Sequence, residues 1–104
     1  MERLAKTEKL NELFSVYQKL FTEKQIAYFN MYYEMDYSYQ EIADHFKVSR
    51  NAIFDQLKRV EENLYLYEDN LKLVANKNKR IELINKFIET KDPKFIEELK
   101  RMDE

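Results

Sequence analysis

The sequence contains no glycine and no cysteine among its 104 residues, and Pro93 is its single proline. Tight turns between strands need residues that tolerate positive φ, and glycine is the usual one. A chain without glycine therefore favours helices over a sheet, and it excludes a glycine-rich phosphate loop. The absence of cysteine excludes a disulfide framework, a thiolate metal site and a cysteine nucleophile.

Long hydrophobic runs are also missing. No apolar stretch approaches the roughly 20 residues that span a membrane, and the first nine residues lack the apolar core of a signal peptide. We therefore expect a cytoplasmic protein with no membrane partner. The length fits one domain over residues 1–104, in which residues 71–104 form a C-terminal helical extension.

Neither sign of charge is in large excess. The formal net charge is −2; residues 1–37 and 61–104 are net negative, whereas residues 38–60 carry four basic and three acidic side chains. This balance gives little general attraction to a phosphate backbone. The 44% hydrophobic content, with eight Tyr and seven Phe, is too rich in aromatic residues for a disordered chain.

Two helix-start signals lie close together in the middle of the chain. Ser38 is followed by Glu41 three residues later, which matches a capping box, and Ser49 matches a second N-cap. The pattern predicts a short helix from Ser38 to about Lys47, a turn of three or four residues, and a second helix that begins at Ser49.

The apolar residues of this segment have the offsets that two steeply crossing helices require. Ala43 is small where the helices would approach each other, Val48 would fill the turn, and Ile53 and Leu57 would return to the same core. These features predict a helix-turn-helix over residues 38–60. Plain packing of two amphipathic helices is the alternative interpretation of the same pattern.

Further helical segments flank the helix-turn-helix. One begins near Thr7, and the next begins at Thr22, which Gln25 completes as a capping box. The second helix of the motif continues to about Asn70. A helix over about residues 74–89, weakest at 76–79, and a last helix over 94–102 follow it. We therefore predict an all-α fold of five or six helices.

The start of the second helix of the motif is the end that would enter a major groove. The residues expected to face solvent on this helix are Arg50, Asn51, Phe54, Asp55, Lys58 and Arg59. The first two could meet base edges, and the last two could reach phosphates. The alternative is an ordinary solvated face, since Asp55 would repel phosphate and Phe54 suggests a protein partner.

The long helix also carries an apolar seam that continues beyond the motif. Together with the C-terminal helices, this seam predicts a homodimer, because two-fold pairing is the commonest assembly. The residues expected in the dimer interface are Val60, Leu64, Tyr67 and Leu71.

Six segments in order resemble the YlxM family of small bacterial helix-turn-helix proteins, which is related to region 4 of sigma factors. They are Leu20-Phe-Thr-Glu-Lys-Gln, Tyr28-Phe-Asn-Met-Tyr-Tyr, Ser38-Tyr-Gln-Glu-Ile-Ala, Val48-Ser-Arg-Asn-Ala-Ile-Phe-Asp, Lys58-Arg and Leu64-Tyr-Leu-Tyr-Glu. The resemblance implies a sigma-region-4-like helix-turn-helix of the winged-helix-like DNA-binding superfamily. Two residues depart from the family: Lys47 stands where glycine or asparagine is usual, and Lys72 stands where many relatives have glycine.

The resemblance also implies functional residues and partners. Ser49, Arg50 and Asn51 would begin a recognition helix, and the triplet Ser38, Tyr39 and Gln40 would approach the nucleic-acid backbone. Genes of this family lie beside those of the signal recognition particle GTPase and its receptor. The implied partners are therefore DNA or the signal recognition particle RNA, and the GTPase or its receptor.

Two functional hypotheses follow. The first is a nucleic-acid-binding regulatory protein of the signal recognition particle pathway. The second is a protein-interaction module, a dimerisation domain or adaptor, which uses the same fold without sequence-specific DNA binding. We expect no enzyme, cofactor or metal site, because the carboxylates are scattered at helix-surface spacing and His45 is the single histidine.

Overall fold

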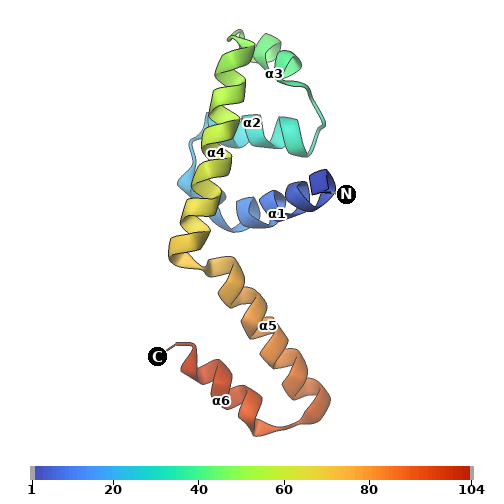
Figure 1. The fold of residues 1–104 in the computed structure, drawn as a ribbon, viewed down its shortest axis with the longest axis vertical. Coiled ribbons are helices and arrows are strands. Elements are labelled where there is room, and N and C mark those ends of the chain that lie inside the picture. Colours follow the sequence, from blue (N-terminus) through green and yellow to red (C-terminus); the bar gives the residue numbers. More distant parts are fainter. Residues whose placement is uncertain (1, 104) are drawn as a thin grey trace. The chain divides into compact units, whose positions relative to one another are not determined.

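The computed structural model describes residues 2–103, with side chains from residue 4, and every regular element in this part is a helix (Figure 1). The all-α prediction is confirmed. The chain divides into two compact units: unit 1 extends to Asn70 and unit 2 begins at Leu71. That the 104 residues act as one domain stays a prediction.

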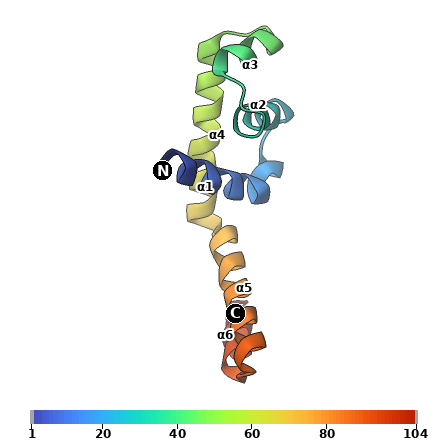
Figure 2. The same cartoon turned by 90° about the vertical axis from the view of Figure 1, so that its right-hand side faces the viewer.

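Unit 1 consists of three shorter helices and one long one. Its elements are α1 (Glu2–Tyr17), the 3₁₀ turn η1 (Gln18–Leu20), α2 (Glu23–Tyr33), α3 (Tyr39–Phe46) and α4 (Arg50–Leu71). In Figures 1 and 2, α1, α2 and α3 lie one after another along α4, with α3 nearest the start of α4. The first helix begins at Glu2 and not near Thr7, so the predicted start is wrong.

The two predicted capping boxes are both present. The Thr22 hydroxyl accepts a hydrogen bond from the Gln25 amide at 3.1 Å, and the Gln25 side chain accepts one from the Thr22 amide at 3.0 Å. Ser38 and Glu41 exchange the same pair of bonds at 3.1 and 3.0 Å. These bonds satisfy amides that a helix start leaves without a partner, so they determine where α2 and α3 begin.

The turn between α3 and α4 depends on Lys47. Its backbone is left-handed, with φ 58° and ψ 44°, although a side chain with Cβ disfavours this region. The Val48 amide donates to the Ala43 carbonyl at 3.0 Å, and the Ser49 hydroxyl then caps α4 by accepting from the Ala52 amide at 3.0 Å. Val48 is 41% exposed, so it fills the turn only in part.

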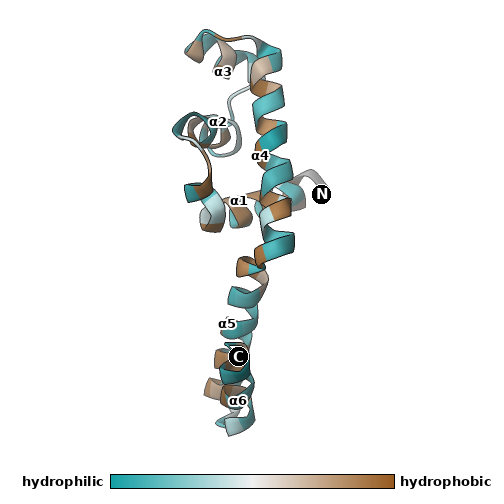
Figure 3. Cartoon of the chain, turned by 90° about the vertical axis from the view of Figure 1, so that its left-hand side faces the viewer, coloured by the Kyte–Doolittle hydropathy of each residue, from teal (hydrophilic) through white to brown (hydrophobic). Residues whose placement is uncertain are grey.

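The core of unit 1 lies where the short helices meet α4. Phe14 of α1 stacks on Phe29 of α2 with 3.9 Å between the ring centroids, and α3 adds the buried Ala43. Figure 3 shows hydrophobic bands that recur along α4 between hydrophilic residues, as expected for an amphipathic helix. The buried side chains on α4 are Ile53, Leu57, Val60 and Leu64.

Two of the residues predicted for a dimer interface belong to this core. Val60 and Leu64 are both 0% exposed within a single chain. A side chain without exposed surface cannot contact a second copy in this conformation, so their assignment to a dimer interface is corrected. Tyr67 is half-buried and its ring lies 5.7 Å from that of Phe21. Leu71 is the one member of the set that is exposed.

Polar bonds from α1 and α2 also reach α4. The Tyr17 hydroxyl donates to Glu68 at 2.6 Å, and the Tyr33 hydroxyl donates to Glu61. Lys6 forms an ion pair with the same Glu61 at 3.4 Å. Burial, and then the hydrogen bond to Glu61, raises the pKa of Tyr33 above its ordinary value. These bonds hold the second half of α4 against the two N-terminal helices.

Unit 2 is a hairpin of α5 (Leu73–Thr90) and α6 (Pro93–Arg101). The Asp92 side chain caps α6 by accepting from the Lys94 amide at 3.0 Å, and Pro93 occupies the first helical position. α5 runs without a break through residues 76–79, so the predicted weak point is not a boundary. No described helix is long and apolar enough to cross a membrane.

Candidate nucleic-acid interface

The start of α4 places three of the predicted contact residues together. Ser49, Arg50 and Asn51 are all exposed there, directly after the α3–α4 turn. The Ser49 hydroxyl is engaged as the cap of α4. Arg50 and Asn51 therefore remain as the side chains of this first turn that could meet a base edge.

Arg50 is held by an aromatic cluster. Its guanidinium carbon lies 5.4 Å from the centroid of the Tyr39 ring. Tyr39 in turn stacks on Tyr32 with 4.7 Å between centroids and meets Phe54 edge-on at 5.6 Å. Burial, and then the hydrogen bond with Tyr32, raises the pKa of Tyr39 to about 12. Tyr39 is thus a neutral platform for Arg50 at physiological pH.

Three side chains with predicted roles in binding have partners within this chain. Phe54, which suggested a protein partner, packs against Tyr39 of the same chain although it is 44% exposed. The predicted backbone contacts Ser38 and Gln40 are both engaged locally. Ser38 forms the cap of α3, and the Gln40 side chain donates to Asp44 at 2.8 Å.

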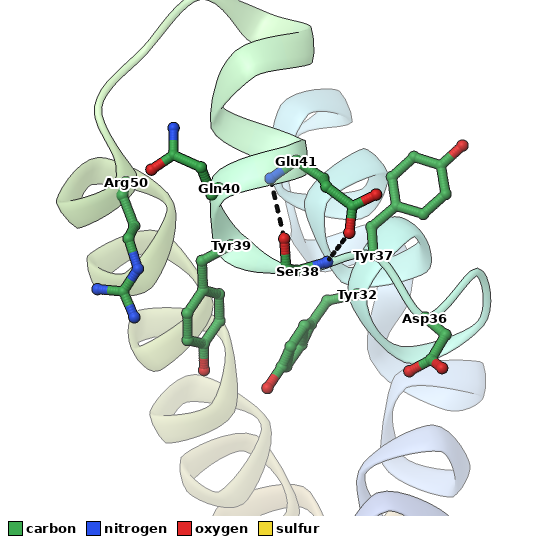
Figure 4. A pocket seen from close by; sticks show the side chains of 8 residues that line it. All are labelled: Tyr32, Asp36, Tyr37, Ser38, Tyr39, Gln40, Glu41 and Arg50. Carbon is green, nitrogen blue, oxygen red and sulfur yellow. Dashed lines mark hydrogen bonds between the residues drawn. The ribbon is translucent and has the colours of Figure 1, made fainter.

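A cavity of about 360 Å³ lies beside this cluster at the junction of α2 and α3 (Figure 4). The Tyr32 and Tyr39 rings lie side by side in this view, and Tyr37 and Asp36 stand apart from them. Asp36 and Glu41 contribute two carboxylates to the lining, against one cation, Arg50. This balance of charge disfavours a phosphate.

The outer face of α4 carries a second shallow cavity, of about 230 Å³. It is lined by Asp55, Lys58, Arg59 and Glu62. Each cation lies three or four residues from each carboxylate, which is the spacing at which helix side chains are neighbours. The positive charges of Lys58 and Arg59 are therefore offset on this face, where both were predicted to reach phosphates.

A third cavity, of about 410 Å³, borders α4 on the side of α2. We call it the Lys24–Arg59 groove. Its lining residues are Thr22, Lys24, Gln25, Tyr28, Val48, Ala52, Gln56 and Arg59. This lining contains two cations and no carboxylate. The sequence analysis did not predict Lys24 as a contact, because nothing near it in the sequence links it to the helix-turn-helix. The sequence places it only in the first turn of the helix that Thr22 caps.

Charge is divided sharply along α4. Residues 50–60 carry three basic side chains and one acidic one, whereas residues 61–71 carry four acidic side chains and no basic one. A phosphate backbone is therefore attracted only to the first half of this helix. The long extension of α4 beyond residue 60 is unsuited to nucleic acid.

Comparison with known proteins agrees with the helix-turn-helix of unit 1. Residues 4–102 match the family model described as "Putative helix-turn-helix protein, YlxM / p13 like". The chain belongs to this family. Its expected membership is thereby confirmed.

The relatives of this YlxM/p13-like chain include three from different bacteria. It is 46% identical to UPF0122 protein BH2485 of Halalkalibacterium halodurans over 86% of this chain and 82% of the relative. It is 40% identical to UPF0122 protein lwe1821 of Listeria welshimeri over 94% and 97%. UPF0122 protein YlxM of Bacillus subtilis is 44% identical over 83% and 78%.

The family description names a helix-turn-helix protein and no reaction. Among the described residues, no group of three His, Cys, Asp or Glu side chains could hold a metal ion. His45 is exposed, with its ring edge-on to Phe46 at 4.9 Å. The features that the structure does assemble are cavities and charges around the first half of α4, which are features of binding.

Proposed function

We propose that this protein is a non-enzymatic regulatory protein that binds nucleic acid through its helix-turn-helix. The observation that carries the proposal is the exposed start of α4, where Arg50 is held over the Tyr39 ring beside Asn51. A guanidinium that is already oriented loses less freedom when it binds a base or a phosphate. The ligand is DNA or the signal recognition particle RNA.

The resemblance to the YlxM family supports a role in the signal recognition particle pathway. The charge of the chain suits a regulator of modest affinity, because the net charge is −2 and few cations surround the start of α4. Affinity that depends on a few phosphate contacts falls with salt along a shallow slope. A structural component of the particle would need a broader basic surface.

Binding across a salt series tests this proposal. Affinity for duplex DNA and for the signal recognition particle RNA is measured for the wild type and for Arg50→Ala. Arg101→Ala, an exposed arginine in unit 2, is the matched control. We expect Arg50→Ala to weaken binding and Arg101→Ala to leave it nearly unchanged. Absence of wild-type binding to both ligands at low salt contradicts the proposal.

A second candidate function is that of an interaction module that forms a homodimer. The observation that favours it is a row of exposed isoleucines on α5, Ile81, Ile84 and Ile88, at the spacing of one helix face. Leu71 lies exposed just before this helix. The signal recognition particle GTPase or its receptor would be the alternative partners of such a surface.

Sedimentation of the full chain at micromolar concentration tests the dimer. Ile84→Asp should convert a dimer to a monomer, whereas Asn85→Asp, the next position on α5, should not. A monomeric wild type contradicts the homodimer. Mixing the monomer with the purified GTPase or receptor then decides whether either protein is the partner.

A further inference from the structure

The lining of the Lys24–Arg59 groove contains no carboxylate, unlike the linings of the two other cavities described beside α4. The cavity at the α2–α3 junction contains Asp36 and Glu41, and the cavity on the outer face of α4 contains Asp55 and Glu62. Only cations contribute formal charge to the Lys24–Arg59 groove. Among these three cavities, it is therefore the one that attracts an anion.

The polar groups of this groove also suit an acceptor ligand. The Gln25 side chain donates to the Gln56 side-chain oxygen at 3.3 Å. The Gln56 oxygen accepts this bond, and the Gln56 carboxamide nitrogen carries two N–H donors. Phosphate oxygens accept hydrogen bonds and donate none, so Gln56 complements the two cations.

The groove has an apolar floor. Tyr28 is buried there, Ala52 is half-buried, and Val48 contributes its exposed side chain from the α3–α4 turn. Apolar walls exclude water and strengthen the attraction between a cation and an anion. The exposed part of the Val48 side chain thus forms a wall of the groove.

Two parts of the chain that are distant in sequence meet at this groove: the start of α2, and the α3–α4 turn together with the first three turns of α4. Lys24 and Arg59 form no ion pair among the described residues. Arg59 also borders the carboxylates of the outer face, whereas Lys24 lines the groove and neither of the other two cavities. A substitution of Lys24 therefore tests the groove without changing the charge of the outer-face cavity.

We propose that the Lys24–Arg59 groove binds a backbone phosphate of the nucleic acid, with Lys24 as a principal contact. This inference rests on the proposed nucleic-acid binding and specifies its geometry. The nucleic acid lies along the α2 side of α4 and not over the outer face. Arg50 and Asn51 then meet the same ligand from the start of the helix.

A pair of lysine variants tests this geometry. Lys24→Gln removes the groove cation, and Lys58→Gln removes an exposed cation of the outer face, which also contains Asp55 and Glu62. Both variants change the net charge equally. Their affinities for duplex DNA and for an RNA hairpin are measured over a salt series, with circular dichroism to establish that each variant folds.

We expect Lys24→Gln to weaken binding several-fold and to reduce the slope of log affinity against log salt by about 1. Lys58→Gln should change both quantities much less. Equal losses, or a larger loss for Lys58→Gln, contradict the inference, as does unchanged binding by Lys24→Gln while the wild type binds. Those outcomes leave the proposed function standing, whereas a wild type that binds neither ligand overturns both.

Discussion

Unit 1 and unit 2 are both built from amphipathic helices, but they bury their apolar side chains to very different extents. Of the described hydrophobic residues that are buried, all but Val74 and Leu83 belong to unit 1. On unit 2, Ile81, Ile84 and Ile88 of α5 stay exposed. Helices with a similar amphipathic pattern therefore bury most of their apolar face in unit 1 and leave much of it exposed in unit 2.

The number of packing partners explains this difference. In unit 1, the three shorter helices all lie along α4, so each helix finds neighbours for its apolar stripe (Figures 1 and 2). A two-helix hairpin covers only the stripe of each helix that faces the other. Short units with so small a core are marginal on their own, and oligomerisation is one usual remedy. Local pattern makes a helix amphipathic, whereas the neighbours decide how much of it is buried.

The largest expected effect comes from shortening one buried side chain in the core of each unit, which leaves an empty space there. Ile53→Ala in unit 1 should lower the free energy of unfolding by about 2–5 kcal/mol, because closely packed neighbours cannot collapse into the space. Leu83→Ala should destabilise the chain less and should act on residues 73–101 alone. Urea unfolding followed by circular dichroism gives the first quantity, and amide hydrogen exchange separates the units. Equal destabilisation of both units by Leu83→Ala would contradict the comparison.

Removal of one polar bond in unit 1 should have the next largest effect. Tyr33→Phe deletes the hydroxyl that donates to Glu61 and should cost about 1.5–3 kcal/mol, the range for hydrogen bonds to charged groups. Tyr65→Phe, on the exposed side of α4, is the control and should cost little. Denaturant titration of both variants checks this prediction.

The same bond predicts a dependence on alkaline pH. The pKa of Tyr33 is raised in the folded state, so its contribution is fully present below the ordinary tyrosine value of about 10 and is lost as pH rises through the folded pKa. The wild type should therefore lose stability above pH of about 10 more steeply than Tyr33→Phe. Parallel curves for the two proteins would show that Tyr33 does not drive the alkaline loss.

A smaller and favourable effect is expected from two of the three described lysines with left-handed backbone, one chosen from each unit. Lys47→Gly in unit 1 and Lys91→Gly in unit 2 should each stabilise by up to about 1 kcal/mol, because glycine adopts φ near 58–59° without a Cβ clash. Thermal unfolding monitors Lys47→Gly, and hydrogen exchange of α5 and α6 monitors Lys91→Gly. Destabilisation by either glycine would mean that its lysine side chain makes a compensating contact.

The smallest effect should come from the surface of unit 2. Lys86 pairs with Glu82 at 2.8 Å, and the hydrogen bond from Lys86 lowers the pKa of Glu82 below 4.5. The stabilising contribution of this pair is present above that value and is lost as pH falls through the lowered pKa. Glu82→Gln should slightly flatten the acid dependence of helix content, compared with Glu89→Gln on the same helix. Identical acid titrations for the two variants would exclude a role for the pair.

The incorrect predictions from the sequence have two physical causes, the unknown neighbour of a helix face and the helix propensity of the residues at a helix end. Val60 and Leu64 have the spacing of an apolar seam, but periodicity does not say whether α1 and α2 or a second copy covers it. The weak point expected at residues 76–79 is not a helix boundary, because asparagine and lysine cost little in a helix that continues on both sides. The start near Thr7 was wrong because residues of good helix propensity precede it and extend α1 to Glu2.

Some residues of the candidate site could be predicted from the sequence, and others could not. Arg50 and Asn51 could be named from the sequence, because the Ser49 cap alone places them in the first turn of α4. Lys24 could not be named, since its link to Arg59 depends on how α2 packs beside the α3–α4 turn. The offset of Lys58 by Asp55 and Glu62 can be predicted from the spacing of these residues on α4.

The sequence by itself determined the helix starts, because a capping box joins side chains and amides only three residues apart. It also determined the helix-turn-helix, since Ala43, Ile53 and Leu57 occur at offsets that two crossing helices require. Only the tertiary structure decided which seam is core and which cations share a cavity. Those outcomes depend on contacts between residues far apart in the chain, and no local pattern encodes the neighbour that a helix face will meet.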